Sequence, residues 1–164
     1  MPSVFVAILM GSDSDLPVMQ DCIELLDKFG ITSEVRITSA HRTPEDTRDY
    51  VRQAEQRGCA VFIAAAGLAA HLAGAVAAQT VRPVIGVPID SGPLQGFDAL
   101  LSTVQMPGGI PVATVAIGKP GAKNAAYLAA QILAINDAGL KAALEEERAV
   151  NAEAIRQKNR ELNS

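Results

Sequence analysis

The sequence predicts an α/β fold in which a parallel sheet of five strands is covered by helices on both faces. Short β-rich runs alternate with longer helical patterns, which is the order that produces parallel strands. The run VFVAIL at 4–9 is continuously apolar, as expected for a strand buried on both faces. The chain has 164 residues, 49% of them hydrophobic, so it can bury one full core. A single domain over 1–164, large enough to be a catalytic domain, is therefore expected.

The other elements follow from periodicity and from residues that start or stop helices. Pro17 suits the first turn of one helix and Gly30 its end, while Thr43 before Pro44 is expected to cap the next. SEVRIT, at 33–38, alternates polar and apolar residues, as an edge strand does. The remaining expected strands are 60–66, 83–88 and 112–117, and the expected helices are 16–29, 44–57, 69–79, 96–104 and 122–135.

The last 28 residues, from Asp137, have a different pattern, with few apolar residues among many charges. Acidic residues come early and basic residues late, which matches the helix macrodipole. About 24 helical residues would extend roughly 36 Å, longer than a small domain needs. Part of the helix over 137–164 is expected to lie on another subunit or to fray into solvent.

Composition restricts the class of partner. A net charge of -4 argues against nucleic acid, whereas a small anionic ligand needs only one or two basic groups. No apolar run approaches the ~20 residues that span a bilayer, and the start carries no basic leader, so a cytoplasmic protein is expected. Cys22 and Cys59 are expected to be reduced packing thiols, and with His41 and His71 they show no metal-ligand spacing.

Three loops follow expected strands at the edge where parallel sheets bind ligands: 10–15, 38–44 and 66–74. The first, MGSDSD, offers Ser12 and Ser14 as donors before a helix start, a cradle for a phosphorylated, hydroxyl-bearing ligand. Asp15 would repel phosphate and is better assigned to ribose hydroxyls. The alternative is a plain turn with a helix cap. Neither a dinucleotide nor an NTPase glycine motif is present.

The second and third loops add charge and a titratable group. Arg42 provides a bidentate fork for phosphate with the Ser39 hydroxyl beside it, and His41 could move a proton near neutral pH. A histidine in a loop can equally be a surface or structural residue. Gly67 and the small residues before His71 would let backbone amides approach a planar ligand, or would serve tight helix–sheet packing.

Six blocks together carry a resemblance to a known family: MGSDSDLPVM, SAHRTP, GLAAHLAG, PVIGVPI, VQMPGGIPVATVAIG and AKNAAYLAAQIL. Over roughly 4–135 the chain closely resembles the bacterial N5-carboxyaminoimidazole ribonucleotide mutases of purine biosynthesis (class I). The resemblance implies a three-layer, flavodoxin-like (Rossmann-like) sheet, a homo-octamer with sites at subunit interfaces, and an isomerisation without cofactor or metal. Its substrate would be a small ribonucleotide.

The resemblance also implies roles for individual residues. Ser12, Ser39 and Arg42 would hold the phosphate, Asp15 the ribose, and His41 would be the general acid/base. The residues expected to contact substrate are Ser12, Ser14, Asp15, Ser39, Ala40, Arg42, Ala66, Gly67, Leu68, Ala69, His71 and Leu72.

The third loop departs from the family pattern. The usual run is close to AGAGGAAHLPG, whereas Ala65, Leu68 and Ala73 stand here in place of glycine, glycine and proline. Leu68 places a side chain where the family pattern has glycine, which could reshape the pocket for the migrating carboxylate. Two rival functions stay open: a related carboxylase that joins free CO2 to aminoimidazole ribonucleotide, and a non-catalytic nucleotide-binding domain.

Overall fold

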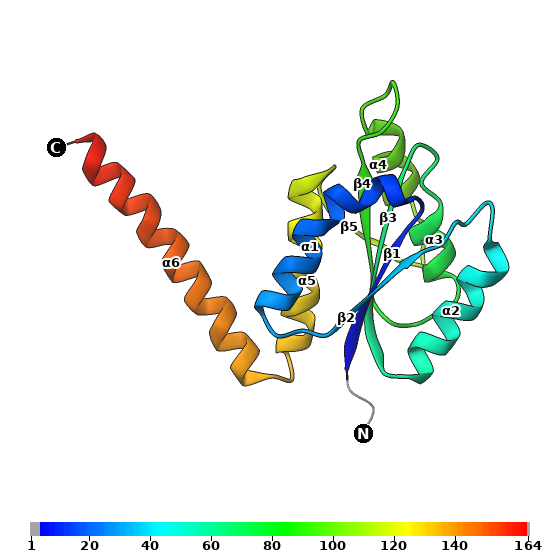
Figure 1. Ribbon diagram of the computed structural model, residues 1–164, viewed down its shortest axis with the longest axis horizontal. Coiled ribbons are helices and arrows are strands. Elements are labelled where there is room, and N and C mark those ends of the chain that lie inside the picture. The colour runs from blue at the N-terminus through cyan, green and yellow to red at the C-terminus, as the bar shows by residue number, and fades with distance from the viewer. Residues whose placement is uncertain (1–3, 164) are drawn as a thin grey trace. The chain divides into compact units, whose positions relative to one another are not determined.

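A computed structural model describes residues 4–163 and contains one five-stranded, all-parallel sheet of order β2-β1-β3-β4-β5 (Figure 1). The predicted fold class is confirmed, including the flavodoxin-like strand order. The order reverses between β1 and β3, so their carboxyl ends diverge into a crevice of the kind that binds ligands. The strands are β1 Phe5–Met10, β2 Ser33–Ile37, β3 Cys59–Gly67, β4 Val84–Ile89 and β5 Ala113–Thr114.

Helices follow the strands in the predicted alternation. They are α1 Leu16–Lys28, α2 Pro44–Gln56, α3 Leu72–Ala77, α4 Phe97–Val104, α5 Lys119–Ala134 and α6 Ala138–Leu162, with a short 3-10 turn, η1, at Asp13–Asp15. The chain forms two compact units that divide within α5, after Ala129. Among the described residues, no helix combines the length and apolarity needed to cross a membrane.

Side-chain alternation along β1 explains why both faces of the sheet are covered. All six residues of β1 are buried, and Phe5, Ala7 and Leu9 share one hydrophobic cluster with residues of α2 and α3. Because side chains alternate along a strand, Val6 and Ile8 face the opposite layer. On that layer α1 and the first part of α5 lie side by side, with the rings of Phe29 and Tyr127 5.9 Å apart (Figure 1).

Three local predictions were wrong in detail. The strand expected at 112–117 is regular only over two residues, although the N–H of Val115 and of Gly118 still donate to carbonyls of β4. As an edge strand, β5 has β4 as its strand neighbour. The helix expected at 69–79 is shorter and spans Leu72–Ala77. The residues just before it, 68–71, form an irregular segment that starts at Leu68, where φ is +55° and therefore not helical.

The third error concerns Thr43. It stands at the N-cap position of α2, as predicted, but its side chain makes no cap hydrogen bond. Its hydroxyl oxygen instead accepts from the N–H of Ser39, 3.0 Å away. The hydroxyl therefore shapes the loop that precedes the helix rather than capping the helix itself.

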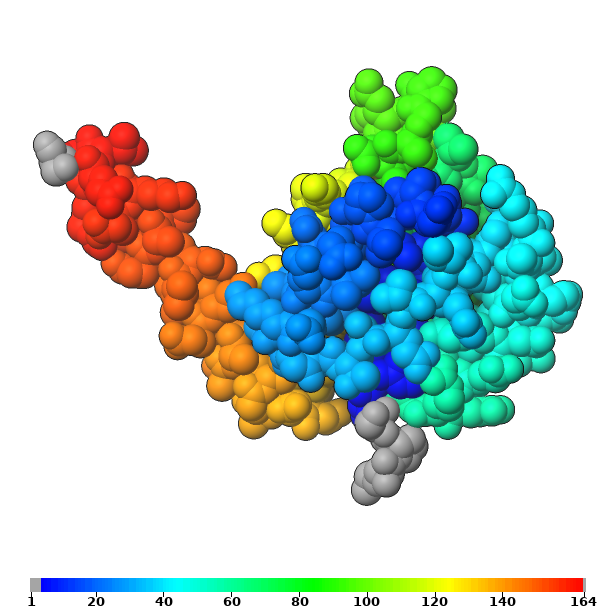
Figure 2. All heavy atoms as spheres, viewed as in Figure 1, coloured from blue at the N-terminus to red at the C-terminus, as the bar shows by residue number. Residues whose placement is uncertain are grey.

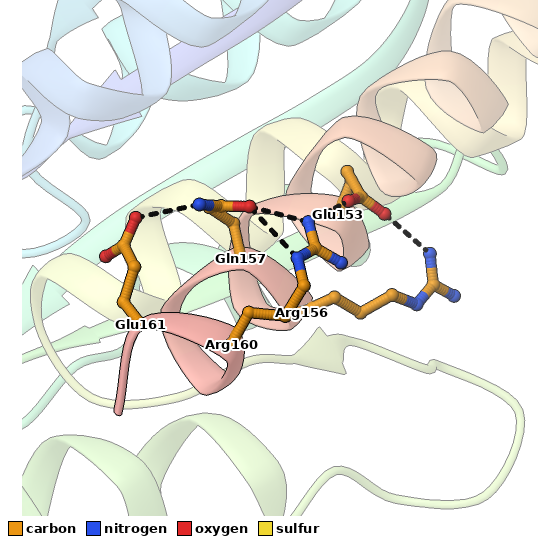
Figure 3. Close-up of polar contacts among 5 residues, drawn as sticks. All are labelled: Glu153, Arg156, Gln157, Arg160 and Glu161. Carbon is orange, nitrogen blue, oxygen red and sulfur yellow. Dashed lines mark hydrogen bonds and ion pairs between the residues drawn. The ribbon is translucent and has the colours of Figure 1, made fainter. Parts of the chain in front are cut away.

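The long C-terminal helix, α6, is confirmed as a helix. Asp137 caps it, accepting from the N–H of Leu140 at 2.9 Å. Along its exposed outer part Glu153 accepts from both Arg156 and Arg160, at 3.3 and 2.6 Å (Figure 3). Such pairs, one to two turns apart, add a few tenths of a kcal/mol each to an exposed helix.

Candidate active site

The three predicted loops converge on one cavity of about 460 Å³ at the carboxyl edge of the sheet. Figure 1 shows them at the same end of the sheet, and in Figure 2 their dark blue, cyan and blue-green atoms lie near one another on the right of the molecular surface. Every residue expected to contact substrate lines this cavity. The lining residues are Gly11, Ser12, Ser14, Asp15, Ser39, Ala40, His41, Arg42, Ala66, Gly67, Leu68, Ala69, His71, Leu72 and Ser91.

The first loop is organised around the hydroxyl of Ser12. Its oxygen accepts from the N–H of Ser14 at 3.2 Å and from the Ser14 hydroxyl at 2.9 Å, which closes η1. Asp15, only 6% exposed, ends this turn and lines the cavity. Burial raises the pKa of its carboxyl, a hydrogen bond from the Ser12 backbone opposes that rise, and the charge of Asp13 adds to it. Asp15 is therefore a hydrogen-bonding group with a weakened preference for the ionised form.

Hydroxyl groups fix the backbone of the second loop through hydrogen bonds. Ser39 Oγ accepts from the N–H groups of His41 and Arg42, at 3.3 and 3.0 Å. Beneath it the buried hydroxyls of Thr38 and Thr47 lie 2.6 Å apart. The backbone that carries His41 and Arg42 is thus fixed on the start of α2. The Ser39 hydroxyl keeps its own hydrogen for donation to a ligand.

His41 and His71 meet across the cavity. Nε2 of His41 lies 2.6 Å from Nδ1 of His71, and the two rings stand nearly perpendicular, at 85°. At this distance one nitrogen must carry the hydrogen and the other must accept it, so the two rings share one proton at this contact. The contact fixes the orientation of the His41 ring and makes His71 its hydrogen-bond partner.

The third loop meets the loop after β4 at Ser91. A Cβ on Gly67 would lie 2.0 Å from Ser91 Oγ, so glycine is required for this close approach. Ser91 is the lining residue that lies outside the three predicted loops, and the sequence analysis missed it. It follows β4 within two residues, so the strand-end rule could have found it, but it lacks the histidine and arginine that made the other loops conspicuous.

Together these features define a class: an α/β protein whose strand-end cavity combines hydroxyls, a guanidinium and a histidine pair, suited to a small phosphorylated ligand and a proton transfer. The chain belongs to the AIR carboxylase family, whose profile matches residues 5–154.

Individual relatives agree with this assignment. The chain is similar to a Pyrococcus horikoshii protein named N5-carboxyaminoimidazole ribonucleotide mutase, with 61% identity over 79% of this chain and 72% of the relative. A Vibrio parahaemolyticus protein of the same name is 51% identical over 92% of this chain and 93% of its own. Among solved structures, Treponema denticola PurE superposes with a TM-score of 0.89 at 32% identity, covering 99% of this chain and 100% of that one.

Proposed function

We propose that this protein is an N5-carboxyaminoimidazole ribonucleotide mutase. It converts that ribonucleotide to 4-carboxy-5-aminoimidazole ribonucleotide in purine biosynthesis by moving a carboxylate from nitrogen to ring carbon. Relatives of that name at 51–61% identity support the proposal. The observation that carries it is the contact of His41 with His71 inside the cavity that Arg42 and Asp15 also line.

Substrate binding follows from the charge and donors of the first two loops. Arg42 and the hydroxyls of Ser12 and Ser39 hold the phosphate, because a guanidinium fork and neutral donors both match its oxygens. Asp15 receives the ribose hydroxyls. The third loop, 66–72, encloses the heterocycle with Ala66, Leu68 and Leu72 as its apolar wall.

The reaction needs one proton delivered and one removed. His41 protonates the carbamate nitrogen, the N–C bond breaks with its electron pair staying on nitrogen, and CO2 is released inside the cavity. The electron-rich C4 then attacks the carbon of CO2, forming the new C–C bond, and His41 takes the proton that C4 loses. Proximity makes this recapture fast compared with escape. His71 holds the ring of His41 in orientation for both steps.

A test of the proton shuttle uses His41→Asn, which keeps size and polarity but does not titrate. Binding of 4-carboxy-5-aminoimidazole ribonucleotide, followed by calorimetry, is expected to stay within about tenfold of wild type while turnover falls by about 10²–10⁴. Ser14→Ala, a change in the same cavity that removes a hydroxyl but no acid or base, is the comparison variant and is expected to affect binding more than turnover. An active His41→Asn enzyme would refute the assignment.

The family description favours one other candidate, a carboxylase that joins free CO2 to aminoimidazole ribonucleotide. It would use the same phosphate and ribose contacts. The two differ in whether the carboxylate of the product comes from the substrate or from solution.

We also propose that residues 1–164 act as one catalytic domain in a cytoplasmic homo-octamer, with 137–164 packing on another subunit. The exposed Val150, Ile155 and Leu162 on α6 support this proposal, because a subunit contact would cover them. Light scattering of the full chain is expected to give eight subunits. A chain ending at Asn136 is expected to form an assembly of fewer subunits. An unchanged number of subunits would contradict the role of α6.

A further inference from the structure

Leu68 has a backbone conformation that leucine rarely adopts. Among the described residues, Leu68 and Gln95 are the two that combine a side chain with a positive φ, +55° and +54°. The left-handed region crowds a Cβ against the neighbouring backbone, so non-glycine residues stay there only when something outside the local chain holds them. At Leu68 this conformation occurs within the candidate active site.

Burial in the core does not explain the leucine. Its side chain is 52% exposed, yet it lines the cavity. It also lies on the loop after β4: a Cβ on Gly92 would come within 2.6 Å of Leu68 Cδ2, and Gly92 itself has φ +75°. The leucine therefore reaches from the loop after β3 to the loop after β4, over a glycine that leaves it space.

The position of this side chain matches a need of the proposed reaction. Released CO2 is small, uncharged and apolar, so shape and dispersion contacts must retain it. Much of the cavity lining is polar, including Ser12, Asp15 and Arg42, and such groups attract water. An apolar side chain at the rim would slow both the escape of CO2 and the entry of water.

We propose that Leu68 retains CO2: it forms an apolar wall, seated on Gly92, that keeps the CO2 released from the carbamate next to C4 until the C–C bond forms. The inference rests on the proposed mutase reaction. Leu68 does not exchange protons or bind the phosphate, so its effect is on the partition of CO2 between recapture and escape.

The test follows the origin of the carboxylate in the product. Substrate with a labelled carboxylate is converted in unlabelled bicarbonate with carbonic anhydrase, so that escaped CO2 mixes at once with the unlabelled pool. The labelled fraction of early product is compared between wild type and variants. Because this is a ratio within the product formed, a lower turnover does not disturb it.

Three substitutions of Leu68, with one control at Gln95, separate the effect of apolar bulk from that of backbone strain. Leu68→Met keeps apolar bulk and is expected to retain label as wild type does. Leu68→Gly and Leu68→Asn both suit a positive φ but remove the apolar side chain, and the ratio of unlabelled to labelled product should rise by about tenfold in each. Gln95→Gly relieves the same backbone conformation outside the cavity lining and should change nothing.

Gly92→Ala provides a second arm. The added Cβ would displace Leu68, so label should be lost in the wild-type background but not further in Leu68→Gly. The proposal is overturned if Leu68→Gly and Leu68→Asn retain label like wild type, or if neither forms product, since Leu68 would then be needed for turnover itself. A wild-type enzyme that makes no product from the labelled substrate would instead reject the proposed function.

Discussion

Thr47→Val tests how the loop that carries His41 and Arg42 is held in place. Thr47, 2% exposed, donates to the carbonyl of Thr43 at 3.1 Å, and its oxygen lies 2.6 Å from that of Thr38. Valine has nearly the same shape, so the substitution removes one hydroxyl and little packing. Thr38, itself 6% exposed, is then left with a weaker partner, the Thr43 hydroxyl at 3.4 Å.

The expected cost follows from that poorly satisfied Thr38 hydroxyl. A buried polar group that loses its partner costs about 1–3 kcal/mol, so we expect a loss of about 2 kcal/mol. For a chain of this size that corresponds to a Tm lower by about 4–8 °C. Because Thr38 directly precedes Ser39, the second loop should also shift, and KM should rise while the reacting groups stay present.

Thr103→Val is the matched control. Thr103 is 3% exposed, and its hydroxyl donates to the carbonyl of Ala99, 2.7 Å away within α4. That carbonyl keeps its helical hydrogen bond, so no group is left unsatisfied and the loss should stay under about 1 kcal/mol. Urea unfolding and initial rates are measured for both variants. Equal stabilities, or an unchanged KM in Thr47→Val, would refute the reasoning.

Three further predictions concern the cavity. Arg42→Lys replaces a bidentate fork by a point charge, so KM from initial rates should rise by about 10–100-fold. Gly67→Ala would set a Cβ 2.0 Å from Ser91 Oγ and should cost about 1–3 kcal/mol in urea unfolding, most of it recovered by adding Ser91→Ala. Burial raises the pKa of Asp15 above its ordinary 3.8, so folding favours the protonated carboxyl. Protonation therefore stabilises the fold fully below pH 3.8, and this stabilisation is lost as the pH rises through the raised pKa. Asp15→Asn, which cannot ionise, should therefore be more stable than wild type at pH 7, with the gain shrinking toward pH 4, and should bind the ribonucleotide less tightly.

Much of the fold could be predicted from sequence because its signals are local. The continuous apolar run at 4–9 and the alternating run at 33–38 identify an inner and an edge strand, and the sheet order places them so. The three loops followed from one rule, that ligands bind at the carboxyl ends of parallel strands. By contrast, β5 is regular over only two residues despite a strand-like sequence. As an edge strand it pairs with β4 alone, so its regularity depends on that one neighbour, which the sequence does not reveal.

The site details that escaped prediction depend on side-chain geometry. His41 and His71 are 30 residues apart, and their contact arises from ring orientations that no spacing rule gives. The leucine at position 68 does not itself indicate a positive φ, because leucine is among the residues least expected there; the indication lies in the glycine that the family pattern has at this position. Thr43 occupies the predicted cap position, but a competing hydrogen bond from the Ser39 backbone determines its hydroxyl's role.

The central claim is that the carboxylate of the product comes from the substrate's own carbamate. The most direct measurement gives the purified wild-type protein N5-carboxyaminoimidazole ribonucleotide with a labelled carboxylate in unlabelled bicarbonate and follows the label at early times. We expect rapidly formed 4-carboxy-5-aminoimidazole ribonucleotide that retains the label. Product that forms only from added aminoimidazole ribonucleotide and CO2, with the label lost, would contradict the mutase and favour the carboxylase.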